Sequence, residues 1–157
     1  MRQWYKAGQG GARLLAALLT ACLLSPVGVS AMDDSQCPPG RSNRTADQVL
    51  SDHVSAILTA NAALVACDYS EEAVVILPGQ VARGPDQIEM LFANFFALMG
   101  GNISVQLTSA TSAAAYTQIL YTINSAHVIV TDGVDTFVIR HGRIAAQTAR
   151  LGGLSFR

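Results

Sequence analysis

The sequence predicts an α+β domain in which helices pack on one face of an antiparallel sheet. In the first part of the chain, apolar residues recur at spacings of three and four, which is typical of amphipathic helices. In the second part, short runs rich in apolar and β-branched residues follow one another, separated by turn residues. No internal repeat, charge run or low-complexity tract interrupts this order of helices first and a strand meander second.

Two N-terminal helices are predicted from their capping residues. Thr45-Ala-Asp-Gln48 reads as a capping box, in which the Thr hydroxyl and the Gln side chain each satisfy a free amide. The stripe that follows faces the core and consists of Leu50, His53, Val54, Ile57 and Leu58. Asn61 is a suitable cap for a short second helix that ends at Ala66.

A third helix is predicted over residues 84–99. Gly84-Pro-Asp86 places proline near the first helical position and an acid at the positive end of the helix dipole. Gly100 and Gly101 end the helix. Its apolar positions form a stripe wide enough to pack on a sheet: Ile88, Leu91, Phe92, Phe95 and Met99.

The strands are predicted from their composition and their turn signals. Residues 73–77 form a β-branched run that Pro78-Gly79 stops. The later strands are expected at residues 103–110, 113–124, 127–131, 134–140 and 143–151. Asp132-Gly133 and His141-Gly142 supply the turn signals between the last of these strands.

Residues 1–31 have the pattern of an export signal. A basic start is followed by an apolar run over residues 14–24 and by the small-residue cleavage pattern Val29-Ser-Ala31. This run is shorter than the ~20 apolar residues of a membrane-spanning helix, so we expect a secreted or periplasmic protein with no membrane span after signal removal. An alternative is a lipoprotein anchored at Cys22, because Leu19-Thr-Ala-Cys22 resembles a lipoprotein cleavage box, although apolar Leu23 and Leu24 follow it.

Cleavage after Ala31 would leave 126 of the 157 residues, which suits one compact domain. We place a flexible N-terminal segment at residues 32–44, the domain at 45–152 and a C-terminal tail at 153–157. The formal charge would change from −1 to −4, so we do not expect the clustered basic surface that binds nucleic acid. The only lysine, Lys6, would leave with the signal, which excludes Schiff-base chemistry.

The two cysteines that remain are Cys37 and Cys67. An even pair in an exported protein favours a Cys37–Cys67 disulfide that ties the N-terminal segment to the domain. The alternative is that Cys67 is a buried small apolar residue and Cys37 a free thiol. No ligand spacing such as Cys-x-x-Cys is present, so no metal site is expected.

Residues 74–88 and 135–144 together resemble the SnoaL-like branch of the nuclear transport factor two-like superfamily. At the level of motifs the chain is most similar to the ketosteroid isomerases, over roughly residues 52–151. The matching motifs are Tyr69-Ser-Glu-Glu-Ala73, the turn into the third helix from Gly84 to Phe92, and Gly142-Arg-Ile144. The resemblance implies a cone-shaped curved antiparallel sheet, with N-terminal helices packed on its concave face and an apolar pocket between them.

The resemblance also implies where site residues lie. The isomerase mechanism needs a carboxylate base, with a tyrosine and a protonated aspartate that donate to the enolate oxygen. Here His53 takes the tyrosine position and Asp135 the aspartate position, but Leu77 takes the position of the base and cannot accept a proton. The candidate catalytic residues are therefore His53 and Asp135, acting as base and orienting carboxylate. The alternative is that Asp135 holds His53 as a buried structural strut.

The pocket implied by the fold has a predicted lining of Leu77, Leu91, Phe92, Phe137, Gln147, Ala149 and Leu151. Gln147 projects into it if side chains alternate along its strand. We expect the pocket to bind a small hydrophobic molecule without a cofactor. One alternative is a cofactor-independent isomerase, cyclase or lyase that uses His53 and Asp135, so whether the protein is an enzyme stays open.

Another alternative is a non-catalytic dimerisation module. Relatives in this superfamily often dimerise through the outer face of the sheet, so we expect a homodimer here too. Thr108, Thr117 and Thr136 are expected to point outward on that face.

Overall fold

The structure is a computed structural model that describes residues 37–157. The predicted export signal, the alternative lipidation site Cys22 and residues 32–36 lie outside the described residues. Among the residues described, no helix has the length and apolar character needed to cross a membrane.

In the described part of the chain, the α-helices begin where the capping signals predict, and α2 and α3 also end where predicted. Helix α1 spans Ala46–Leu58, and the capping box between Thr45 and Gln48 is present. Asn61 caps α2, which spans Ala62–Ala66. Helix α3 spans Gly84–Met99 and ends at Gly100, whose φ of 72° is in the left-handed region that glycine adopts readily.

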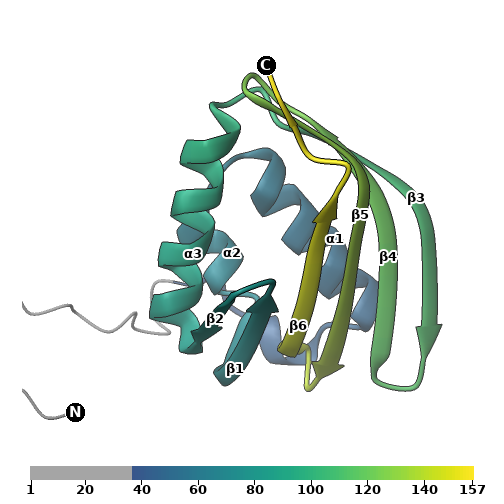
Figure 1. Cartoon of the computed structure of the whole chain (residues 1–157). Coiled ribbons are helices and arrows are strands. Elements are labelled where there is room, and N and C mark those ends of the chain that lie inside the picture. Colours follow the sequence, from purple (N-terminus) through teal and green to yellow (C-terminus); the bar gives the residue numbers. More distant parts are fainter. Residues whose placement is uncertain (1–36) are drawn as a thin grey trace, which may run out of the picture. The chain divides into compact units, whose positions relative to one another are not determined.

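The strands form one curved sheet with the order β2-β1-β6-β5-β4-β3, and β7 pairs with β5 (Figure 1). The strands are β1 Tyr69–Leu77, β2 Gln80–Arg83, β3 Ser104–Ala113, β4 Tyr116–Asn124, β5 Val128–Arg140, β6 Arg143–Gly152 and β7 Ser155–Phe156. Pro78 and Gly79 form the turn between β1 and β2, as predicted. The neighbouring pairs are antiparallel except β1 and β6, which run parallel. The sheet is therefore mixed, whereas the sequence predicted a wholly antiparallel one.

The predicted turn at Asp132-Gly133 is wrong. Both residues lie inside β5, which continues from Val128 to Arg140. Gly133 is opposite Tyr121 of β4, and a Cβ atom added at Gly133 would lie 2.3 Å from the Tyr121 ring. This glycine therefore makes room for a large ring on the neighbouring strand and does not form a turn.

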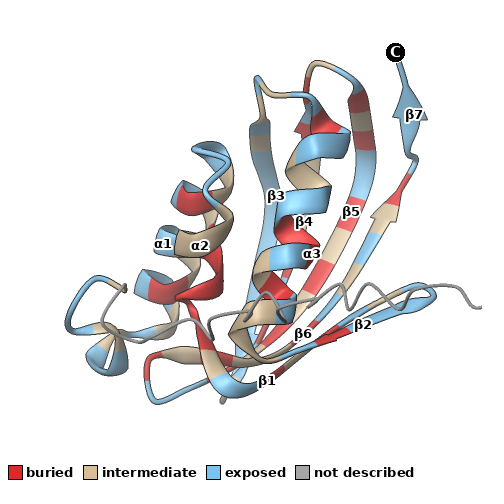
Figure 2. Ribbon diagram, turned by 90° about the vertical axis from the view of Figure 1, so that its left-hand side faces the viewer, coloured by how far each residue is buried: buried red, intermediate tan, exposed pale blue. Residues whose placement is uncertain are grey.

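The helices lie on the concave side of the sheet, and buried residues occur both in the helices and along the strands (Figure 2). Along β4 the buried residues alternate with more exposed ones, and they are Thr117, Ile119, Tyr121 and Ile123. The predicted outward position of Thr117 is therefore wrong. Its side chain is 2% exposed and lies within 3.0 Å of the Ser112 hydroxyl.

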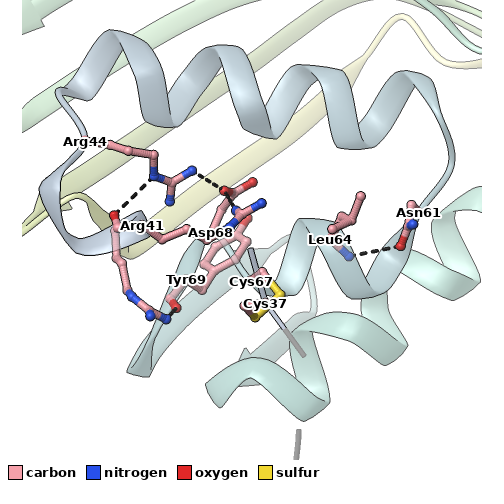
Figure 3. Close-up of a disulfide and its surroundings, with 9 residues drawn as sticks. Cys37, Arg41, Arg44, Asn61, Leu64, Cys67, Asp68 and Tyr69 are labelled. Atoms are coloured by element: carbon pink, nitrogen blue, oxygen red, sulfur yellow. Dashed lines mark hydrogen bonds and ion pairs between the residues drawn. A yellow bond between two sulfur atoms is a disulfide. The ribbon is translucent and has the colours of Figure 1, made fainter. Parts of the chain in front are cut away.

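A disulfide joins Cys37 to Cys67, as predicted (Figure 3). Close to it, Asp68 is fully buried and forms ion pairs with Arg41 and Arg44. Arg44 also donates to Asp52 at 2.8 Å. The part of the predicted flexible segment that the structure describes is thus anchored to the domain by one covalent bond and by a shared buried carboxylate.

Candidate ligand-binding pocket

A cavity of about 100 Å³ lies between the helices and the concave face of the sheet. Helices α1 and α3 and strands β1, β3, β4, β5 and β6 all contribute side chains to its wall. Most of these side chains are aliphatic or aromatic. All nine residues that the sequence nominated for the site line this one cavity: His53, Leu77, Leu91, Phe92, Asp135, Phe137, Gln147, Ala149 and Leu151.

Asp135 lies in the cavity wall and is the centre of a connected set of polar side chains. Tyr121 donates its hydroxyl hydrogen to Asp135 Oδ1 at 2.9 Å, and Gln147 Nε2 donates to Asp135 Oδ2 at 2.8 Å. The Gln147 amide oxygen in turn accepts a hydrogen bond from the Tyr69 hydroxyl. Four side chains from β1, β4, β5 and β6 are joined in this way, and we call them the Asp135 network.

The strand register explains how the Asp135 network forms. Ile119 is opposite Asp135 across the β4–β5 pair, and Tyr121 is opposite Gly133. Because Gly133 has no side chain, the Tyr121 ring can lie across β5 and its hydroxyl can reach Asp135 on the same face. On the other side, Gln147 is opposite Phe137, one inward position along from Asp135.

Burial governs the ionisation of the Asp135 network. Asp135 is 7% exposed, and loss of solvent raises its pKa to about 6, although the Tyr121 hydrogen bond, the His53 charge and the Gln147 hydrogen bond lower it. Burial, together with the charge of Asp135, raises the pKa of Tyr121 and Tyr69, so both phenols stay protonated donors. At neutral pH the network therefore holds a mostly ionised carboxylate in an apolar cavity.

His53 lies in the same cavity wall but does not pair with Asp135. Its side chain is buried, and its Nδ1 atom is 3.6 Å from Asp68 Oδ2. Neither ring nitrogen has a hydrogen-bond partner. The rings of Tyr69, Phe92 and Phe137 surround it in edge-on contacts, with centroid distances of 5.5 to 5.7 Å. The structure thus brings His53 and Asp135 to one cavity without a hydrogen bond between them, and the carboxylate nearest to His53 is Asp68.

Sequence reasoning missed three polar residues of this region: Asp68, Tyr69 and Tyr121. The inward alternation of β4 could have placed Tyr121 in the wall, because Ile119, Tyr121 and Ile123 share one face. No comparable signal marks Asp68, whose burial depends on two arginines that are more than twenty residues away. Within residues 37–157, no cluster of three or more His, Cys, Asp or Glu residues suits a metal ion.

Comparisons with known proteins find likeness in structure and none in sequence. No family model matches the chain, and no curated protein matches it. Among solved structures, a hypothetical protein of Catenulispora acidiphila with a ketosteroid isomerase-like fold, solved in complex with trimethylamine, is 13% identical with a TM-score of 0.59 over 69% of this chain and 88% of that one. A putative polyketide cyclase of Sinorhizobium meliloti is 12% identical with a TM-score of 0.58, over 76% of this chain and 100% of that one.

A third similar structure is the epoxide hydrolase/cyclase-like enzyme SalBIII, which takes part in pyran ring formation in the polyether salinomycin. It is 10% identical, with a TM-score of 0.60 over 71% of this chain and 95% of that one. At such low identity these likenesses show the fold alone. The chain has the nuclear transport factor two-like fold, also called ketosteroid isomerase-like, which confirms the predicted fold. Because one fold can support many functions, the function of the protein has to be inferred from the residues of the site.

Proposed function

We propose that the protein binds a small, largely hydrophobic molecule in the cavity between its helices and its sheet. The observation that carries this proposal is the wall itself, in which apolar side chains surround a few convergent polar groups of the Asp135 network. Binding sites for small molecules generally have this composition.

The size of the cavity limits the ligand. An apolar protein cavity of roughly 150 Å³ holds benzene. At about 100 Å³, this cavity suits a molecule on the order of four to six non-hydrogen atoms without rearrangement. The trimethylamine complex of the Catenulispora protein supports a ligand of this size, because trimethylamine is equally small.

The test narrows the cavity and leaves the rest of the sheet unchanged. Ala149 lines the cavity, and Ala146 lies on the same strand three residues earlier, outside the cavity wall. We expect Ala149→Leu to weaken binding of a small apolar probe such as benzene at least tenfold, because the added carbons occupy the cavity. The matched control Ala146→Leu leaves the affinity unchanged. Nuclear magnetic resonance titration of the backbone amides measures both.

Two results would contradict the proposal. One is the absence of saturable shifts around the cavity in the unsubstituted protein for a set of small apolar and polar probes. The other is equal binding by the Ala149→Leu and Ala146→Leu proteins, which would place the probe outside this cavity.

A second candidate function is a cofactor-independent isomerase, cyclase or lyase that uses His53 and Asp135. Asp135 has a pKa raised to about 6 by burial, and His53 has two ring nitrogens without hydrogen-bond partners beside the same cavity. A carboxyl group with this pKa can take up and release protons near neutral pH, and a histidine side chain is a common general acid or base. On a substrate that the protein turns over, His53→Ala should lower kcat about a hundredfold or more. Unchanged kcat would remove His53 from the mechanism.

We also propose that the protein works outside the cytoplasm, secreted or in a periplasm, and as a homodimer. The Cys37–Cys67 disulfide supports an oxidising compartment. The outer face of the sheet supports a dimer, because partly exposed apolar residues on neighbouring strands, Leu120 and Val134, lie opposite each other there.

A further inference from the structure

Two aspartates of residues 37–157 are buried, and their surroundings are very different. Asp68 is compensated by ion pairs with Arg41 and Arg44. Asp135, at 7% exposed, accepts hydrogen bonds only from neutral donors, the Tyr121 hydroxyl and the Gln147 amide. No arginine of the described residues pairs with Asp135, and the only lysine of the chain is Lys6. One buried carboxylate is thus neutralised by the protein, and the other is not.

The uncompensated carboxylate is the one that faces the cavity. Asp135 is part of the cavity wall, whereas Asp68 is not. An ionised carboxylate offers about four acceptor positions. Two of these are filled by Tyr121 and Gln147, so Asp135 retains acceptor capacity for a donor inside the cavity.

Aromatic rings lie around the same space. Phe92, Phe137 and Tyr121 all contribute to the cavity wall with Asp135. The electron-rich face of an aromatic ring attracts a cation, and the attraction strengthens when water is excluded. A carboxylate and several rings around one small apolar cavity form a combination that favours an organic cation over a neutral molecule of the same shape.

We propose that the ligand of this cavity is a small organic cation, an alkylammonium whose N–H group donates to Asp135 while its alkyl groups contact the apolar wall. This inference rests on the proposed function and narrows it from a small hydrophobic molecule to an amine. The ligand supplies a positive charge beside Asp135, where the described part of the chain places only His53, which is cationic when protonated.

Four ionisable or polar groups face Asp135 from the surrounding elements: His53 from α1, Tyr69 from β1, Tyr121 from β4 and Gln147 from β6. The two phenols and the amide are neutral and donate hydrogen bonds. His53 is the only cationic group among them when protonated, and its Nδ1 atom lies 3.6 Å from Asp68 Oδ2. Because the pKa of Asp135 is about 6, cation binding weakens below that pH as the carboxyl group becomes neutral.

A matched pair of probes tests the inference. tert-Butylammonium and tert-butanol share one carbon skeleton and differ in charge at the polar group. We expect tert-butylammonium to bind roughly ten- to a hundredfold more tightly than tert-butanol at neutral pH, as charge-assisted hydrogen bonds are the stronger ones. Titrations followed by backbone amide shifts give both affinities in the full domain.

Substitutions on one strand identify the responsible carboxylate. Asp135→Asn should reduce the ratio of the two affinities to about one, because the shape is kept and the charge is lost. Asp132→Asn, three residues earlier on β5 and exposed, should leave the ratio unchanged. Circular dichroism and thermal melting of each variant establish that it is folded.

Three other outcomes of these titrations would contradict the cation inference, the role of Asp135 or the proposed function. If tert-butanol binds as tightly as tert-butylammonium, the cation inference is wrong and the proposed binding function stands. If the preference for the cation persists in Asp135→Asn, a different site holds the amine. If neither tert-butyl probe shifts the amide signals of the cavity wall while small apolar probes such as benzene do, the cation inference fails. If no probe shifts these signals, the proposed binding function fails together with the cation inference.

Discussion

At the scale of single residues, Asp135 has a consequence for stability that does not depend on any ligand. Burial raises its pKa in the folded protein from 3.8 to about 6. The folded state therefore binds this proton more tightly than the unfolded state does. The resulting stability is fully present below pH 3.8 and is lost as the pH rises through about 6. Above that pH the ionised carboxylate costs about 3 kcal/mol, from a shift of roughly two pKa units.

We therefore predict that Asp135→Asn stabilises the protein at neutral pH by up to about 3 kcal/mol and has little effect near pH 4. The Gln147 amide can turn over, so that its oxygen accepts from the new Asn side chain. Urea denaturation across this pH range measures the difference in the free energy of unfolding between the variant and the unsubstituted protein. Asp132→Asn serves as the exposed control, for which no such pH-dependent difference is expected. If the difference in the free energy of unfolding between Asp135→Asn and the unsubstituted protein is the same at pH 4 and pH 7, the pKa of Asp135 is not raised in the folded protein.

Residues of the site differ in how far sequence alone can place them. Asp135, Phe137 and Gln147 follow from strand alternation once the strands are known, and the structure puts them in one wall. The partner of His53 does not follow, because Asp68 reaches it through the packing of α1 against the chain that leads into β1. The sequence wrongly predicts a turn at Gly133, because the dipeptide Asp-Gly favours turns. The same glycine is also what a strand needs where the Tyr121 ring crosses it.

At the scale of elements, local signals decide what is predictable. Helix α3 is correct at both ends because Pro85, Asp86 and Gly100 act on the adjacent backbone. The parallel pairing of β1 with β6 cannot be predicted from local signals, because these strands are about seventy residues apart and the intervening chain sets their direction. The continuous β5 likewise depends on its two neighbours, β4 and β6, which pair along both sides of it.

The segment before α1 gives a prediction at this scale. The Cys37–Cys67 disulfide closes a loop with a sequence separation of 30 residues. A loop of this length, when closed in the unfolded chain, stabilises the native state by about 3–4 kcal/mol. We predict that the double substitution Cys37→Ser and Cys67→Ala lowers the free energy of unfolding by this amount in urea denaturation.

A reducing agent supplies the control for this prediction. Reduction should destabilise the unsubstituted protein by a similar amount and leave the double variant unchanged. If the unsubstituted protein unfolds at the same urea concentration with and without reductant, the disulfide does not contribute to stability. The ion pairs of Asp68 with Arg41 and Arg44 would then be what holds the segment.

At the scale of the whole molecule, the fold separates two surfaces. The helices lie on the concave side of the sheet and leave the opposite face uncovered (Figure 1). The cavity lies between the helices and the concave face. Leu120, Val134 and Val138 lie on that outer face and remain partly exposed. Polar residues also occur there, such as Thr136, so the surface is mixed in character. Mixed surfaces with an apolar centre are typical of non-obligate interfaces between proteins.

We predict that the protein sediments as a dimer at micromolar concentration and that Val134→Lys converts it to a monomer. Val134 is opposite Leu120 on β4 and Arg150 on β6, so a lysine there adds a charge at the centre of the outer face. A charge without a partner is costly to bury in an interface, whereas it is solvated in the monomer.

Val134→Thr, with nearly the same shape and no charge, is the control and should weaken the dimer less. Sedimentation velocity distinguishes the species, and thermal melting excludes unfolding as the cause. A dimer that persists with Val134→Lys would place the interface elsewhere, and a monomeric unsubstituted protein at high concentration would rule out assembly through this face.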